Sequence, residues 1–176
     1  MHDTERLFRD YHGMLVRYLT RRLGDRDWAE EVAQETFVRA LRQESIVNER
    51  SWLFAVANNL VRDDARRAAR QRKHLELLAA EARELEREAP EEPLEITKEM
   101  AHESADARRA LESLAERDRQ ALLLKEEGLD YGEIAEVLGI EKSSVGTTLS
   151  RARRRLAETY EALQEERRRR EQHVAS

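Results

Sequence analysis

The chain has 176 residues and a net charge of −5, a length that suits one medium domain or two small ones. Charged residues make up 39%, while glycine, proline and aromatic residues are few, so the composition favours an all-helical protein with two small domains over one large core. The lack of cysteine excludes disulfides and thiolate metal sites, and without a secretory signal or an apolar run of ~18 residues we expect a cytoplasmic protein with no membrane insertion.

Two helices are predicted at the start of the chain. Apolar residues recur at i, i+3 and i+4 over residues 7–19, and this helix is expected to end near Gly24. Asp27 and Glu30 form a D-x-x-E capping pair, which predicts the start of a second helix. The apolar face of that helix covers residues 28–41.

A third helix is expected after a short loop. Residues 43–50 lose the helical period and indicate the loop, and Ser51 is a suitable N-cap for the helix that follows. Apolar residues at helical spacing then occupy residues 52–61. The helix continues into residues 62–73, which hold six cations against two acids.

An acidic segment separates this N-terminal helical bundle from the rest of the chain. Residues 1–73 carry a net charge of +3, residues 74–103 carry −7 and residues 104–176 carry −1. Pro90 and Pro93 would break any helix that continued through the segment. The sequence therefore predicts two small helical domains, residues 1–73 and 104–176, joined by an acidic linker.

The second domain is expected to contain a helix-turn-helix. Two helices over residues 105–114 and 117–125 lead into it. Asp130 and Glu133 form a capping pair at the start of the next helix, and Gly139 lies where the chain must turn sharply.

The last helix of this unit has an apolar stripe formed by Val145, Leu149, Ala152 and Leu156. Its other face carries cations and short hydrogen-bonding groups, the chemistry that reads base edges and holds phosphates in a major groove. The candidate DNA-binding residues are Lys142, Ser143, Ser144, Thr147, Thr148 and Arg151. A helical hairpin with a solvated basic face is the alternative. Residues 157–170 are expected to form a solvated helical extension that frays at its end.

Three runs of residues, in this order, resemble the extracytoplasmic-function (ECF) group of bacterial RNA polymerase sigma factors. Residues 28–41 resemble the family's signature helix, and residues 52–67 resemble its promoter-reading helix. Residues 131–156, from Tyr-Gly-Glu-Ile-Ala to Arg-Ala-Arg-Arg-Arg-Leu, resemble its C-terminal helix-turn-helix. The resemblance implies a sigma factor whose partners are promoter DNA and core RNA polymerase, including the β′ clamp helices and the β flap. An anti-sigma factor is a candidate further partner.

The resemblance also implies roles for particular positions. It assigns the −35 element to the helix-turn-helix, and the capture of a flipped-out −10 base to the loop at residues 43–50. It also implies that the acidic linker runs through the RNA exit route of the polymerase. It implies polymerase contacts for Glu30, Glu31, Gln34, Glu35 and Arg39. It implies −10 contacts for Asn58, Asn59, Arg62, Arg66 and Arg67.

The chain departs from the family in its recognition helix, where basic residues are frequent at the positions of Gly146 and Thr148. Gly146 weakens a helix by up to ~1 kcal/mol relative to alanine, although it also allows close approach of backbone to DNA. The methyl group of a threonine can contact a thymine methyl, which predicts an altered base preference. Trp28 and Trp52 lie on apolar faces, so we expect core packing for both rather than base stacking.

No catalytic function is expected. The five histidines are scattered, and we find no nucleophile with a base positioned beside it and no glycine loop for phosphate. No cofactor or metal is expected either. Two alternatives to a sigma factor remain at this point: a stand-alone helix-turn-helix regulator that binds operator DNA without polymerase, and a helical scaffold protein.

Overall fold

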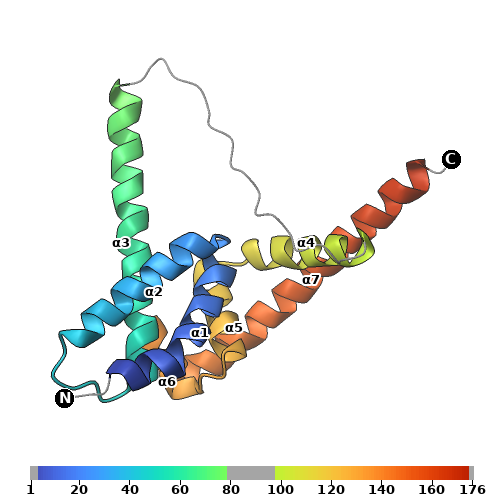
Figure 1. The fold of residues 1–176 in the computed structure, drawn as a ribbon. Helices are drawn as coiled ribbons and strands as arrows, with labels where there is room; N and C mark the ends of the chain where they lie inside the picture. Colours follow the sequence, from blue (N-terminus) through green and yellow to red (C-terminus); the bar gives the residue numbers. More distant parts are fainter. Residues whose placement is uncertain (1–3, 79–97, 175–176) are drawn as a thin grey trace. The chain divides into compact units, whose positions relative to one another are not determined.

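The computed structural model describes residues 4–78 and 98–174, and these residues form seven α-helices and no strand (Figure 1). The predicted all-α fold is confirmed. The chain divides into two compact units, Met1–Glu91 and Glu92–Ser176. The central part of the predicted acidic linker lies outside the described residues. Among the described helices, none combines the length and the hydropathy that a transmembrane span requires.

Unit 1 is a bundle of three helices, α1 (Thr4–Leu23), α2 (Arg26–Leu41) and α3 (Glu49–Leu78), each of which contacts the other two. Gly24 follows α1 with a φ of 71°, in the left-handed region that glycine adopts without cost, so the predicted end of this helix is confirmed. The bundle encloses an apolar core. Its fully buried members include Leu7, Leu15, Tyr18, Leu19, Ala33, Leu53, Phe54 and Ala57.

The predicted starts of α2 and α3 are wrong by two and three residues. Asp25, not Asp27, caps α2, because its side chain accepts the backbone N–H of Trp28 at 3.0 Å. Ser51 is buried inside α3, which begins at Glu49, and its hydroxyl donates to the carbonyl of Asn48 at 3.3 Å. Asp25 and Asp27 are both able to cap the start of α2, and Asn48 and Ser51 are both able to cap the start of α3. A start at the earlier residue lengthens the helix that packs in the bundle.

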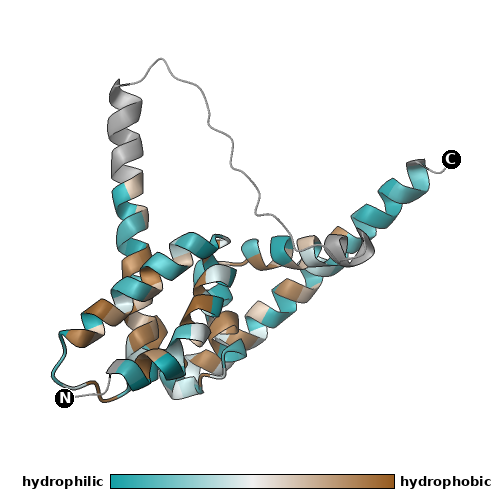
Figure 2. Ribbon diagram, viewed as in Figure 1, coloured by the Kyte–Doolittle hydropathy of each residue, from teal (hydrophilic) through white to brown (hydrophobic). Residues whose placement is uncertain are grey.

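Unit 2 contains α4 (Lys98–Glu112), α5 (Glu116–Glu126), α6 (Tyr131–Leu138) and α7 (Lys142–Val174). Helix α7 contacts each of the other three, so it is the central element of the unit. Helix α4 begins seven residues before the predicted position. Hydrophobic residues are concentrated in the part of α7 that follows α6, and the last turns of α7 are hydrophilic (Figure 2).

The sequence predicted that the C-terminal extension is a solvated helix that frays at its end. The structure differs from this prediction. Helix α7 continues without a break to Val174, and residues spaced along one face of the extension are partly covered. Arg167 on this face pairs with Asp106 of α4 at 3.6 Å, and both side chains are largely buried. Leu163 lines a pocket with Ala105 between the same two helices. The extension therefore packs against α4.

Candidate functional site

Local hydrogen bonds fix the turn between α6 and α7. Asp130 Oδ1 accepts the backbone N–H of Glu133 at 2.9 Å, and Glu133 Oε2 accepts the backbone N–H of Asp130 at 2.8 Å, so the predicted capping box is confirmed. Gly139 ends α6 with a φ of 63°, and the N–H of the next residue, Ile140, returns to the carbonyl of Ala135 at 3.0 Å. Together these contacts form the helix-turn-helix.

Four of the six candidate DNA-binding residues of α7 share an accessible surface. They are Lys142, Ser143, Ser144 and Thr147, and all are exposed. The predicted apolar stripe lies on the opposite side of the helix, where Val145, Leu149 and Ala152 are fully buried. Because the stripe packs inside unit 2, the polar side of α7 is left exposed to solvent.

Thr148 does not belong to that surface. Its side chain is only 6% exposed, and its hydroxyl donates to the carbonyl of Ser144 at 2.9 Å. The prediction that Thr148 contacts DNA is therefore corrected to a packing role. Ser150 and Arg154, which the prediction did not name, are also exposed and continue the face of Thr147 at helical spacing. That spacing was visible in the sequence.

Arg151 is accessible but already paired. Its Nε donates to Asp118 Oδ2 at 3.0 Å, and its Nη2 donates to Asp118 Oδ1. Asp118 lies on α5 and is 1% exposed, whereas the Arg151 side chain is 41% exposed. The hydrogen bond from Arg151 holds the pKa of Asp118 below its ordinary value, and the same bond raises the pKa of Arg151.

In unit 1, Asn58 is a core residue. It is 1% exposed, and its Oδ1 accepts a hydrogen bond from the Tyr18 hydroxyl at 2.8 Å and one from Arg22 Nη1 at 2.5 Å. A side chain that is buried and engaged in this way has no surface to offer DNA. The prediction of a −10 contact for Asn58 is therefore corrected to a structural role that joins α1 to α3.

The other four candidates on α3 are exposed: Asn59, Arg62, Arg66 and Arg67. Two of them form weak ion pairs along the helix, Arg66 with Asp63 at 3.9 Å and Arg67 with Asp64 at 3.8 Å. Pairs this exposed contribute little to stability.

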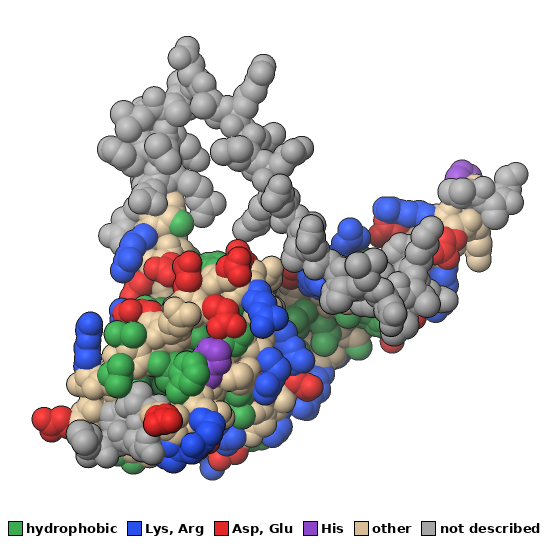
Figure 3. All heavy atoms as spheres, in the orientation of Figure 1, with side chains coloured by type: hydrophobic (Ala, Val, Ile, Leu, Met, Phe, Trp, Pro, Cys, Tyr) green, Lys and Arg blue, Asp and Glu red, His purple; other side chains and the backbone are tan. Residues whose placement is uncertain are grey.

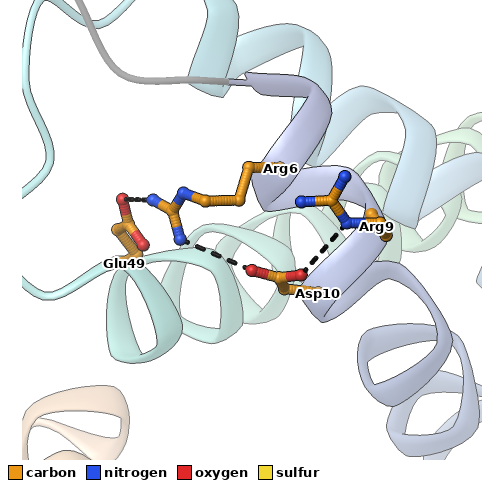
Figure 4. Close-up of polar contacts among 4 residues, drawn as sticks. All are labelled: Arg6, Arg9, Asp10 and Glu49. Carbon is orange, nitrogen blue, oxygen red and sulfur yellow. Dashed lines mark hydrogen bonds and ion pairs between the residues drawn. The ribbon is translucent and has the colours of Figure 1, made fainter.

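The loop of residues 42–48, between α2 and α3, is tied down where α3 begins (Figure 4). Glu49, in the first turn of α3, accepts a hydrogen bond from Arg6 of α1, and Arg6 also approaches Asp10 at 3.5 Å. The bond to Glu49 raises the pKa of Arg6. The loop is thus anchored at its second end.

The candidate polymerase-binding residues lie on α2. Glu31, Gln34 and Glu35 are exposed, and Arg39 donates to Glu35 at 3.0 Å. Glu30 is half-buried and lies 3.3 Å from His12 of α1.

Two exposed apolar side chains, Val38 and Leu41, lie on the same helix as these polar residues. Phe8, exposed on α1, stacks on His12 with ring centroids 4.3 Å apart and meets Phe37 of α2 edge-on at 5.1 Å. Figure 3 shows hydrophobic side chains gathered on this face of unit 1, with acidic side chains beside them.

Comparison with known proteins identifies the family. The family described as sigma-70 region 2 matches residues 7–71, and the one described as sigma-70 region 4 matches residues 104–156. The chain is 35% identical over 158 residues to the ferric citrate uptake sigma factor FecI of Escherichia coli (strain K12), covering 84% of this chain and 85% of that protein. The chain belongs to the sigma-70 family of sigma factors.

Further relatives place it in the ECF group of that family, as the resemblance implied. It is 33% identical to the RNA polymerase sigma factor YlaC of Bacillus subtilis (strain 168), over 93% of this chain and 95% of that protein. Its fold is similar to that of the sigma factor RpoE of Bartonella quintana, solved in complex with the anti-sigma factor NepR. The TM-score is 0.64 at 21% identity, covering 89% of this chain and 96% of that one.

Each unit of the chain corresponds to one region of the family. Region 2 corresponds to α1–α3, and region 4 begins in α4 and ends within α7 at residue 156. The extension that packs on α4 thus lies beyond the matched region. Sigma factors are not enzymes, and no group of three metal-binding side chains occurs among the described residues.

Proposed function

We propose that this sigma factor binds core RNA polymerase and directs initiation at promoters whose −35 element it reads through α7 and whose −10 element it opens through α3. The observation that carries the proposal is the accessible polar face of α7, with Ser143 and Thr147 at its centre, opposite a fully buried apolar stripe. Short polar side chains at the start of a helix suit a major groove, which displays a distinct pattern for each base pair.

On α7 the proposed contacts divide by chemistry. Lys142 and Ser143 lie in the first turn, where free backbone N–H groups and the helix dipole favour a phosphate. Ser144 and Thr147 are proposed to meet base edges, and the Thr147 methyl suits a thymine methyl. The exposed Arg154, one turn beyond Ser150, adds a cation for the backbone.

In unit 1 the proposed −10 surface consists of Asn59, Arg62 and Arg66, which lie on one face of α3 at i, i+3 and i+7. The loop of residues 42–48 precedes this helix and is proposed to receive an extruded base. Val47 in this loop is 93% exposed, an unusual position for an apolar side chain, and can pack against an unstacked base.

The proposed polymerase contact is the exposed face of α2. It offers the carboxylates of Glu31 and Glu35 together with the apolar side chains of Val38 and Leu41. A mixture of this kind, apolar groups with a charged border, is typical of protein interfaces. An acidic border would steer α2 towards a basic partner surface. An anti-sigma factor that covers this face remains a prediction.

Run-off transcription with core RNA polymerase and genomic fragments tests the proposal. We expect discrete transcripts only when both the chain and the core enzyme are present. The chain alone should bind the same fragments weakly at ~0.15 M salt, because a net-negative protein releases few counterions from DNA. Tight, sequence-specific binding without polymerase would instead support a stand-alone regulator.

Single substitutions then separate the surfaces. Arg62→Ala and Arg66→Ala should reduce promoter opening, measured by permanganate reactivity of unpaired thymines, without changing the affinity for core enzyme. Glu35→Arg should reduce that affinity. Arg168→Ala, which removes an exposed cation from the far end of α7, is the matched control for loss of charge.

A further inference from the structure

Asp118 is the least exposed carboxylate among the described residues, and it lies on α5, outside the polar face of α7. Both of its oxygens accept hydrogen bonds from one guanidinium, that of Arg151. Burial of a carboxylate is unfavourable unless it is paired and hydrogen-bonded. The pairing partner therefore has to stay in place for unit 2 to keep its packing.

The geometry of this pair restrains the rotation of α7 in a way that apolar contacts do not. A planar guanidinium that meets a carboxylate at two points fixes both direction and distance, whereas an apolar stripe tolerates small rotations. Arg151 follows Thr147 by four residues, so the two lie on the same side of α7, one turn apart. A restraint at Arg151 therefore also restrains where Thr147 points.

We infer that Asp118 is a positioning residue for promoter recognition, because its two-point pair with Arg151 sets the rotation of α7 that presents Ser144 and Thr147 to the bases. This inference rests on the proposed reading of the −35 element by α7. It also changes the role of Arg151, which becomes half of an internal restraint instead of a free phosphate anchor. The low pKa of Asp118 keeps the carboxylate charged, so the pair is intact at neutral pH.

The two roles of Arg151 predict opposite effects for Asp118→Asn. If Arg151 served as a phosphate anchor, loss of its acidic partner would free its charge and strengthen binding to every upstream sequence. If the pair positions α7, the same change weakens discrimination between upstream sequences. Arg151→Lys separates the roles again, because lysine keeps the charge but loses the two-point geometry.

The experiment is single-round transcription by reconstituted holoenzyme on a promoter obtained by run-off, in two forms, one with its own upstream element and one with that element scrambled. We expect Asp118→Asn and Arg151→Lys each to lower the ratio of the two transcripts by about tenfold, the effect of losing one good base contact. The double variant should lose no more than the worse single variant, because both changes remove one restraint.

Controls make each outcome decisive. Glu165→Gln, the same kind of change in an exposed ion pair of the extension, should leave the ratio unchanged. Far-UV circular dichroism checks that each variant folds, and if Asp118→Asn does not fold, Arg151→Lys alone decides. A wild-type ratio in folded Asp118→Asn and Arg151→Lys would overturn the inference. A wild-type chain that ignores the upstream element would instead overturn the proposed function.

Discussion

The Tyr18 hydroxyl and the side chain of Asn58 form a hydrogen bond of 2.8 Å that joins α1 to α3 inside the core of unit 1. Arg22 donates to the same oxygen, so one amide satisfies two buried donors. Asn58 therefore stabilises the helix that carries the proposed −10 surface without reaching that surface. Its neighbour Asn59, rotated by about 100° around α3, is exposed.

Asn58→Ala should lower the free energy of unfolding of unit 1 by about 2 kcal/mol, because it leaves two buried donors without their acceptor. Asn59→Ala should change it by less than about 0.5 kcal/mol. Both tryptophans, Trp28 and Trp52, lie in unit 1, so tryptophan fluorescence during urea unfolding reports this unit alone. Equal stability of the two variants would contradict the buried network.

Gly146→Ala should stabilise unit 2 by up to about 1 kcal/mol, because alanine is the better residue inside a helix. A Cβ at this position would lie 3.6 Å from Tyr131 Cε2, an ordinary contact. Gly146 thus faces Tyr131 of α6, where there is room for the added methyl group. A higher midpoint of the Gly146→Ala variant in thermal unfolding, followed by circular dichroism, would confirm the stabilisation. A lower midpoint would contradict it.

Thr147→Val should change which upstream sequences the holoenzyme prefers, whereas Thr148→Val should not. The first change removes a hydroxyl from the exposed face, and the second removes one that bonds back to Ser144 inside the unit. Transcription from a pool of promoters randomised in the upstream element, followed by sequencing, measures both. If Thr148→Val also changed the preferred upstream sequences, the DNA-contacting face of α7 would have to include Thr148, contrary to our assignment.

Arg167→Ala should loosen the contact between the extension and α4, because it leaves the carboxylate of Asp106 buried without its cation. We expect a loss of about 1–3 kcal/mol in the local stability of α4. Hydrogen exchange of α4 amides in the full chain measures it. Arg168→Ala, one residue along and exposed, is the control, and equal exchange in the two variants would mean that the packing contributes nothing.

Acid should destabilise unit 2 through Asp118. Its pKa in the folded chain lies below its value of about 3.9 in an unfolded chain, so the pair contributes fully above that value and less as the pH falls through the folded pKa. Asp118→Asn should be less stable than wild type at pH 7, and the difference should shrink in acid. Thermal unfolding between about pH 2 and pH 7 measures the difference, and a constant difference would contradict the assignment.

Local patterns predicted the helices well, and burial and contacts between distant residues explain part of what they missed. The capping box of Asp130 and Glu133 was predictable because both partners lie within one turn. Asn58 was misassigned because a resemblance locates a helix without fixing its rotation to one residue. Thr148 was placed on the polar face from its residue type, although it borders the buried apolar stripe of α7. The partner of Arg151 lies 33 residues away, and no local pattern links it to Asp118.

The continuity of α7 has a mechanical consequence. Its 33 residues form a rod of about 50 Å, at 1.5 Å per residue. The helix begins at the surface proposed to contact DNA. Its later turns contact α4, which is the first helix of unit 2. The surface proposed to read DNA and the contact with α4 are thus parts of one continuous helix. A change in the direction of α7 at the DNA would therefore also move the surface on which α4 packs.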